Sequence, residues 1–135
     1  MCHVVEVAAD GKDIRVEKVW SGVDIGPVIN MSGAMNQVEG GFIDGLSTAQ
    51  LEITYAGGAA EQANFDTYPI LRFDRAPEIE CHFVQSDIRP SGLGEPPIAA
   101  VAPAIANAIF AATGMRIREL PFGKSGIKLQ IRGRM

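Results

Sequence analysis

The sequence predicts one small α+β domain, in which a mixed or antiparallel sheet packs with two main helices. A length of 135 residues allows a single compact core. Runs rich in Val and Ile alternate with polar residues, as in strands, and two other segments carry apolar residues at helical spacing. A hydrophobic fraction of 47% with 21% charged residues is typical of a folded chain rather than a disordered one.

The first elements are expected to be a β-hairpin and a helix. Residues 3–24 form two alternating runs joined by the turn sequence DGK, which predicts the hairpin. A loop over 25–33 follows, because Gly26 and Pro27 interrupt regular structure. Segment 32–53 then predicts a helix, since its apolar residues have roughly helical spacing: Ala34, Met35, Val38, Phe42, Ile43 and Leu46.

Glycines inside this helix are unusual. Each of Gly40, Gly41 and Gly45 costs about 1 kcal/mol relative to alanine in a helix interior. Such a cost is tolerated where something packs very close to the backbone. The sequence leaves open whether that partner is another helix, a strand or a ligand.

The middle of the chain is expected to be extended. Residues 51–58 predict a strand that ends in a glycine turn, and residues 60–73 predict a second extended segment. Residues 76–86 alternate again and predict a further strand. About three strands after a helix fit an α+β domain.

The last part of the chain combines an irregular segment with a second helix. Prolines and glycines in residues 87–97 interrupt both helical and strand ladders. Residues 98–114 predict a helix that is apolar on nearly all sides and ends at Gly114. A chain this short seldom surrounds a helix completely, so part of this helix is expected to contact another chain or domain. Residues 127–135 are expected either to add a short strand or to fray.

Charge and composition argue against several function classes. The net charge of −4 with only 12 Lys and Arg residues argues against a nucleic-acid partner. The N-terminus lacks the basic start and apolar core of a secretory signal. Pro97 and Pro103 break the longest apolar run, so no membrane span is expected. A cytoplasmic location follows as the expectation, with transport to the periplasm only through a partner that carries its own signal.

Two Cys–His pairs, Cys2–His3 and Cys81–His82, raise the question of a metal site. Both pairs lie in strand-like runs, where neighbouring side chains point to opposite faces of a sheet. One face therefore collects at most one member of each pair, which is too few for a closed site. Free cysteines commonly serve as small buried hydrophobic residues, and no metal-ligating residue is predicted.

Glu95 is the residue best placed for chemistry. It lies between Gly94 and two prolines, directly before the second predicted helix. The backbone N–H groups and the dipole at a helix N-terminus favour an anion. Two roles are open at this point: a general base, or a cap of the helix, which is the commoner role of an acid there.

Gln37 lies near the start of the first predicted helix, in the sequence QVEGG. A side-chain amide beside bare glycine backbone suits hydrogen bonding to a polar cofactor. The alternative is a surface glutamine on a helix that packs tightly against its neighbour. The residues alone favour neither.

Both motifs occur together in a known family. The sequences VDIGPVIN, QVEGGFIDGLS, NFDTYPILR, APEIECHFV and GLGEPPIAAVAPAIANAIFAATG follow one another in this chain. In this order they resemble the C-terminal end of the molybdopterin-binding subunit of the xanthine dehydrogenase and aldehyde oxidase family, especially the isoquinoline 1-oxidoreductase type. QVEGG and GEPP are the specific part of the resemblance. Residues 1–122 are therefore assigned to the C-terminal segment of such a subunit, and residues 123–135 to a basic C-terminal tail.

The resemblance implies a role for each motif. Glu95 matches the family's active-site glutamate, the general base that takes the proton of the attacking hydroxyl beside molybdenum. Gln37 matches the glutamine that hydrogen-bonds the molybdopterin cofactor. Gly40 and Gly41 are assigned to the same cofactor site, because bare backbone suits its crowded packing. Gly94 is assigned to it as well, as part of the loop that brings Glu95 to the metal.

The subunits of this family are several times longer than the present chain, which determines the partners implied by the resemblance. Molybdenum–molybdopterin is expected to be shared with a larger molybdopterin-binding chain and to be absent from the isolated chain. Electrons are expected to leave through an iron–sulfur or haem electron-transfer subunit. Apolar surface left exposed where these parts pack predicts a homo-oligomer in isolation.

Two hypotheses about function follow. In the first, the chain is a fragment or split subunit of a molybdenum hydroxylase that oxidises an aldehyde or N-heterocycle with water as oxygen source, and it is inactive alone. In the second, it is a stand-alone non-catalytic module used in subunit assembly or in binding a small ligand or protein. The presence of Glu95, Gln37 and the glycines favours the first, since a scaffold needs no carboxylate on a glycine hinge.

Overall fold

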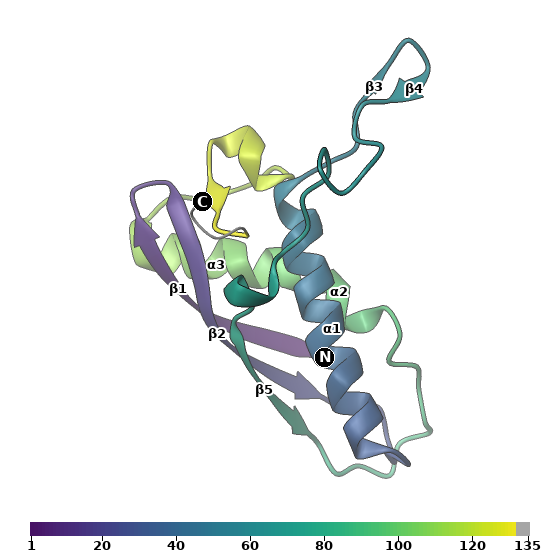
Figure 1. The fold of residues 1–135 in the computed structure, drawn as a ribbon. Coiled ribbons are helices and arrows are strands. Elements are labelled where there is room, and N and C mark those ends of the chain that lie inside the picture. The colour runs from purple at the N-terminus through teal and green to yellow at the C-terminus, as the bar shows by residue number, and fades with distance from the viewer. Residues whose placement is uncertain (132–135) are drawn as a thin grey trace.

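The computed structural model describes residues 1–131 of the chain. A four-stranded mixed sheet packs with two main helices, which confirms the predicted α+β class (Figure 1). The strands of this sheet are β1 (Cys2–Asp10), β2 (Asp13–Val23), β5 (Glu78–Phe83) and β6 (Lys128–Leu129).

Strand β2 is the centre of the sheet. β1 pairs with it antiparallel along one edge, from Cys2 opposite Gly22 to Asp10 opposite Asp13, which confirms the predicted hairpin. On the other edge, β5 and β6 both run parallel to β2, each along a different half of the strand. The strand predicted over 76–86 is therefore also confirmed, as β5.

A β-bulge keeps the apolar side chains of β2 on one face. Glu6 pairs with Lys18 but Val7 pairs with Val16, so Glu17 is an additional residue in β2. Side chains alternate with a period of two, so one additional residue changes the parity of the buried positions. The buried residues of β2 are accordingly even-numbered before the bulge and odd-numbered after it: Ile14, Val16, Val19, Ser21 and Val23.

Helix α1 (Met31–Gln50) confirms the first predicted helix. Asn30 caps its N-terminus, because the side chain accepts a hydrogen bond of 3.0 Å from the N–H of Gly33. One face of α1 is buried in the core with residues of β2 and the last helix. Its buried residues are Val38, Gly41, Phe42, Gly45, Leu46, Ser47 and Ala49.

The second predicted helix consists of a short helix, α2 (Pro96–Ala99), followed by α3 (Val101–Thr113). Gly114 ends α3 with a φ of 75°, a left-handed conformation that glycine adopts at little cost. Only a stripe of α3 is buried, formed by Val101, Ile105 and Ile109. The rest of this apolar helix is partly or fully exposed.

The run Pro96–Thr113 has 18 residues with a mean hydropathy of 1.4, and 22% of it is buried. By length and composition alone, this is enough to cross a membrane. The expectation that no apolar run is long enough to do so is therefore not supported by these two measures. The core helix of a globular domain passes the same test, so the finding is weak evidence.

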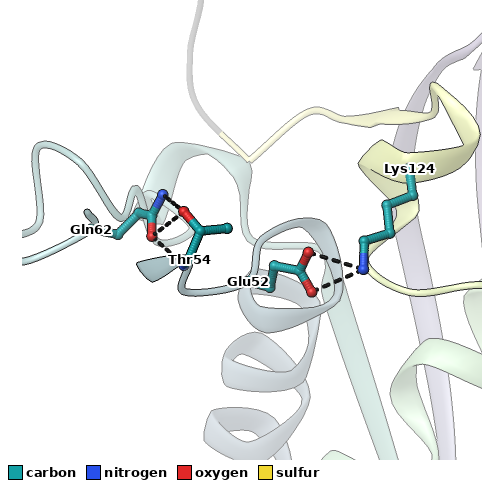
Figure 2. A network of polar contacts seen from close by, with 4 residues as sticks. All are labelled: Glu52, Thr54, Gln62 and Lys124. Carbon is teal, nitrogen blue, oxygen red and sulfur yellow. Dashed lines mark hydrogen bonds and ion pairs between the residues drawn. The ribbon is translucent and has the colours of Figure 1, made fainter. Parts of the chain in front are cut away.

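Residues 51–70, here called the arm, project from the C-terminal end of α1 (Figure 1). The strand predicted over 51–58 was too long, because only Tyr55–Ala56 forms a strand, β3, which pairs with β4 (Ala59–Ala60). Glycines at the turn have φ of 59° and 82° and reverse the chain after two residues. Polar contacts such as Gln62 Nε2 to Thr54 Oγ1, 2.9 Å, close the base of this hairpin (Figure 2).

The extended segment predicted over 60–73 was also wrong. It consists mainly of turns and irregular backbone, and the short helix η1 (Phe73–Arg75) begins at its last residue. Most side chains from 60 to 70 are exposed, so the alternation of buried residues that stabilises a strand is absent there.

The C-terminal residues return to the core. The short helix η2 (Phe122–Ser125) leads into β6, so the strand alternative for 127–135 is confirmed at Lys128–Leu129. Ile127, Leu129 and Ile131 are buried with Phe122 in the same core cluster. The described part of the segment expected as a basic tail thus contributes core side chains, while residues 132–135 lie outside the described residues.

Candidate active site

The candidate base lies at the end of a long loop that is hydrogen-bonded to other parts of the chain. The glutamate loop, residues 84–95, follows β5 and passes the N-terminal end of α1 before α2 begins (Figure 1). Val84 N donates to Val23 O over 2.8 Å, and Ser91 N donates to Ile25 O over 3.1 Å. These bonds hold the loop along the end of β2 and the segment that follows it.

Glu95 has an exposed side chain at the N-cap position of α2. Its carboxylate makes no capping hydrogen bond, although its backbone carbonyl accepts a bond of 2.9 Å from Ile98 N. The structure therefore does not show the side-chain cap that the sequence left open. An exposed carboxylate without that bond is available to a ligand or a proton.

Gln37 contacts the glutamate loop directly. Its Nε2 donates a hydrogen bond of 2.7 Å to the carbonyl oxygen of Gly94, across 57 residues of sequence. Gln37 belongs to the exposed face of α1, and Gly94 directly precedes Glu95 in the chain. The structure thus brings together Gln37, Gly94 and Glu95, the central residues predicted for the site.

The two adjacent glycines of α1 have different surroundings. A Cβ at Gly40 would meet no other atom within 4 Å, so this backbone faces open space. A Cβ at Gly41 would lie 2.5 Å from Pro97 Cβ, a distance that real Cβ atoms do not adopt. One turn later, a Cβ at Gly45 would lie 2.6 Å from Val101 Cγ2. The close partner of Gly41 and Gly45 is therefore the second helical segment, whereas Gly40 is open to a ligand.

His3 is a polar residue near this site that the sequence pattern connects only with a rejected metal site. Its Nε2 lies 2.9 Å from the carbonyl oxygen of Pro97, and its Nδ1 lies 2.8 Å from Ser21 Oγ. A carbonyl oxygen only accepts hydrogen bonds, so in neutral His3 Nε2–H donates to Pro97 and Nδ1 accepts from Ser21. The ring also packs edge-on against Phe42, with 5.2 Å between ring centroids.

Burial lowers the pKa of His3 from the ordinary value of 6.5, and the nearby N-terminal charge lowers it further. The hydrogen bond to Pro97 acts in the opposite direction but does not reverse the shift. The alternation of β1 carried a signal for the partial burial of His3, because it places His3 on the same face as Val5 and Val7, but it did not identify the partners. A polar side chain at a partly buried position requires hydrogen-bond partners.

The described residues contain no group of three or more His, Cys, Asp or Glu side chains placed to hold a metal ion. Cys2 and Cys81 are both free thiols, and burial is the main cause of the raised pKa of Cys81. The chemistry of the site is therefore that of one carboxylate and one amide at an open, glycine-lined surface.

Fold and site together define a class of protein. It is an α+β domain that presents an amide and a carboxylate from two distant segments on one exposed surface. Residues 1–77, more than half of the chain, match the family model described as a molybdopterin cofactor-binding domain. The chain belongs to this family, which confirms the resemblance inferred from QVEGG and GEPP.

Relatives and solved structures agree with this assignment. Isoquinoline 1-oxidoreductase subunit beta of Brevundimonas diminuta is 38% identical over 109 residues, which are 80% of this chain but 14% of that subunit. Aldehyde oxidoreductase of Desulfovibrio desulfuricans matches with a TM-score of 0.68 and 28% identity, over 82% of this chain and 13% of that one. Quinoline 2-oxidoreductase of Pseudomonas putida shares the fold, with a TM-score of 0.70 and 21% identity over 81% of this chain and 15% of that one. The chain thus spans about a seventh of the length of these proteins.

Proposed function

We propose that the chain supplies one wall of the active site of a molybdenum hydroxylase, with Glu95 as its general base. The observation that carries the proposal is the bond of 2.7 Å from Gln37 Nε2 to Gly94 O, which joins the two motifs of the resemblance. The names of two relatives, an isoquinoline oxidoreductase and an aldehyde oxidoreductase, support an N-heterocycle or an aldehyde as the proposed substrate. Water as the source of oxygen is part of the proposal.

Gln37 and the nearby glycines are suited to contact one side of a molybdenum–molybdopterin cofactor. Gln37 uses one amide hydrogen on Gly94 and keeps its second N–H and its oxygen for a cofactor. The backbones of Gly40 and Gly94 face open space, where a Cβ would meet no other atom within 4 Å. Gly41 supports the same surface from behind, because it lets Pro97 approach α1. When bound, the cofactor supplies a metal centre that accepts two electrons from the substrate.

Glu95 accepts a proton in this proposal. A general base must reach the proton that it removes, and the end of the glutamate loop places this carboxylate at the exposed surface beside Gln37. Covering of that surface by the rest of the enzyme would remove water from the carboxylate and raise its proton affinity. An uncovered site does not exclude water, which supports the expectation that the chain is inactive alone.

The remaining cofactor contacts are proposed to come from a larger molybdopterin-binding chain, whether continuous with this one or separate. An iron–sulfur or haem electron-transfer subunit is proposed to take the electrons. Large apolar side chains on or next to α1 and the glutamate loop are exposed and suit such packing. They include Ile29 at 98%, Ile88 at 49% and Met35 at 39% exposure. In isolation, the same side chains are proposed to hold copies of this chain together as a homo-oligomer.

The base is tested by Glu95→Gln in the assembled enzyme. The amide keeps the shape of the side chain but accepts no proton, so turnover is expected to fall by about 10²–10⁴-fold. Molybdenum and pterin content should stay unchanged. Glu119→Gln, which changes another exposed carboxylate, is the matched control and should alter neither quantity. An unchanged rate in Glu95→Gln would remove the assignment.

Assembly is tested by purifying the chain from its native host and measuring molybdenum and co-purifying protein. The proposal predicts a complex with a larger molybdopterin-binding chain. Metal-free, partner-free chain from a host that makes the cofactor would favour the second hypothesis, a non-catalytic module for assembly or for binding a small ligand or protein.

A further inference from the structure

The backbone around Glu95 is held from both sides by side chains of other elements. The carbonyl oxygen of Gly94, one residue before Glu95, accepts the bond of 2.7 Å from Gln37 on α1. The carbonyl oxygen of Pro97, two residues after Glu95, accepts a bond of 2.9 Å from His3 on β1. Glu95 therefore lies between two fixed points, one set by a helix and one by the sheet.

The contact from the sheet is itself fixed by packing. Ser21 Oγ lies 2.8 Å from His3 Nδ1, and Ser21 is completely buried on the central strand β2. The edge contact between the rings of His3 and Phe42 ties the imidazole to α1 as well. Bonds on both ring nitrogens and a ring contact leave the imidazole little freedom to rotate.

The position of Pro97 is restricted from the other side by α1. Pro97 is fully buried, and a Cβ at Gly41 would lie 2.5 Å from its Cβ. Pro97 thus packs against bare helix backbone while its carbonyl oxygen accepts the His3 bond. The first turn of α2 therefore cannot move closer to α1 at Gly41 without a clash, and the His3 bond joins the same turn to the sheet.

We propose that His3 is a positioning residue that acts with Gln37 to fix the backbone of Glu95 relative to the sheet and α1. His3 does not touch the reacting groups in this proposal; it acts on the base through Pro97. The two bonds, from Gln37 to Gly94 and from His3 to Pro97, are here called the clamp. The clamp is a property of this chain and is testable without the cofactor, whereas its consequence for catalysis rests on the proposed function.

The first experiment uses the full chain labelled with ¹⁵N. In the wild type, His3 is expected to show the Nε2–H tautomer by NMR, as the bond to Pro97 requires. In His3→Leu, the amide of Ile98, which is bonded to Glu95 O, is expected to exchange about fivefold faster relative to the amide of Gln130, which is bonded to Ile14 O on β2 and lies far from His3 in sequence. The matched control is His82→Leu on β5, where the histidine is 64% exposed and pairs with Glu80. It should leave the ratio of the two rates unchanged.

A milder variant, Ser21→Ala, covers the case in which His3→Leu does not fold. It removes the partner of Nδ1 while the imidazole stays, and it should raise the same exchange ratio by a smaller factor. An Nδ1–H tautomer in the wild type would overturn the clamp. The proposal would also be overturned if the ratio of the Ile98 and Gln130 exchange rates stays at the wild-type value in the folded variants. His3 would then act only on overall stability.

The assembled enzyme tests the consequence for catalysis. His3→Leu is expected to lower kcat about tenfold with KM and molybdenum content unchanged, because misplacing the base affects the transition state and not substrate binding. His3→Gln, which can present an amide N–H to Pro97, should recover part of kcat. The positioning role alone would be overturned by one combination of results. In it, His3→Leu speeds Ile98 exchange but leaves activity unchanged, while the Glu95→Gln enzyme is still inactive. An active Glu95→Gln enzyme with the exchange result intact would instead contradict the proposed function.

Discussion

Two long segments with little regular structure, the glutamate loop and the arm, differ in what holds them. The glutamate loop is bonded to the chain after β2, to α1 through Gln37 and, just beyond its end, to β1 through His3. The arm is stabilised chiefly by contacts between near neighbours, such as those of Thr54 with Gln62 (Figure 2). Another is the bond of 2.7 Å from Tyr68 N to Asn64 O. A carboxylate intended for chemistry needs the first kind of support, since side-chain placement depends on fixed surroundings.

The comparison predicts that the arm and the body, which is the sheet with the helices packed on it, respond very differently to loss of an aromatic ring. Phe42→Ala should lower the free energy of unfolding by about 3–5 kcal/mol, because the ring is completely buried and contacts His3. Tyr55→Ala in the arm should change it by no more than about 0.5 kcal/mol, since Tyr55 is 72% exposed. Urea unfolding measures both. Equal effects would mean that the arm packs as the body does.

The contact between α1 and α2 is tested by two adjacent glycines. Gly41→Ala should destabilise the chain by about 1–3 kcal/mol, because the new Cβ would clash with Pro97. Gly40→Ala should stabilise it by up to about 1 kcal/mol, because the new Cβ meets open space and alanine favours a helix. Thermal unfolding of the pair gives the answer. Stabilisation by both variants would contradict the close approach of Pro97.

Much of the fold was predictable because its signals are local. The alternation in β1, β2 and β5 and the helical spacing in α1 and α3 predicted every long element. The arm was misjudged, because β-branched and aromatic residues near position 53 indicate a strand only when a neighbour buries them. The bulge at Glu17 was not predicted, although the apolar positions of β2 change from even-numbered at Val16 to odd-numbered at Val19.

The site was predictable only in part. Glu95 and Gln37 were found from motifs, and the structure adds the contact between the Gln37 side chain and the loop. His3 was missed because its partners, Ser21 and Pro97, are 18 and 94 residues away in sequence. Such contacts depend on how β1 lies against α2, which no local pattern encodes.

The His3 contact gives a pH dependence with a defined sign. Burial lowers the pKa of His3 in the folded chain below 6.5, so the unfolded chain binds the proton first as the pH falls. Stability from neutral His3 is therefore fully present above about pH 6.5 and is lost as the pH falls through the lowered pKa. The difference in unfolding free energy between wild type and His3→Gln should shrink from pH 7.5 to pH 5. A difference that grows on acidification would contradict the shift.

The smallest effect is expected at the base of the arm, where Lys124 of η2 pairs with Glu52 (Figure 2). The Nζ lies 2.9 and 3.1 Å from the two carboxylate oxygens, with both side chains almost half exposed. A double-mutant cycle with Glu52→Gln and Lys124→Met should give a coupling of about 0.2–1 kcal/mol, because solvent screens such a pair. The coupling should nearly vanish at about 1 M salt, where the screening length is only about 3 Å. A larger, salt-independent coupling would show that the arm is anchored to the body by a desolvated contact, and the contrast with the glutamate loop would then be one of degree.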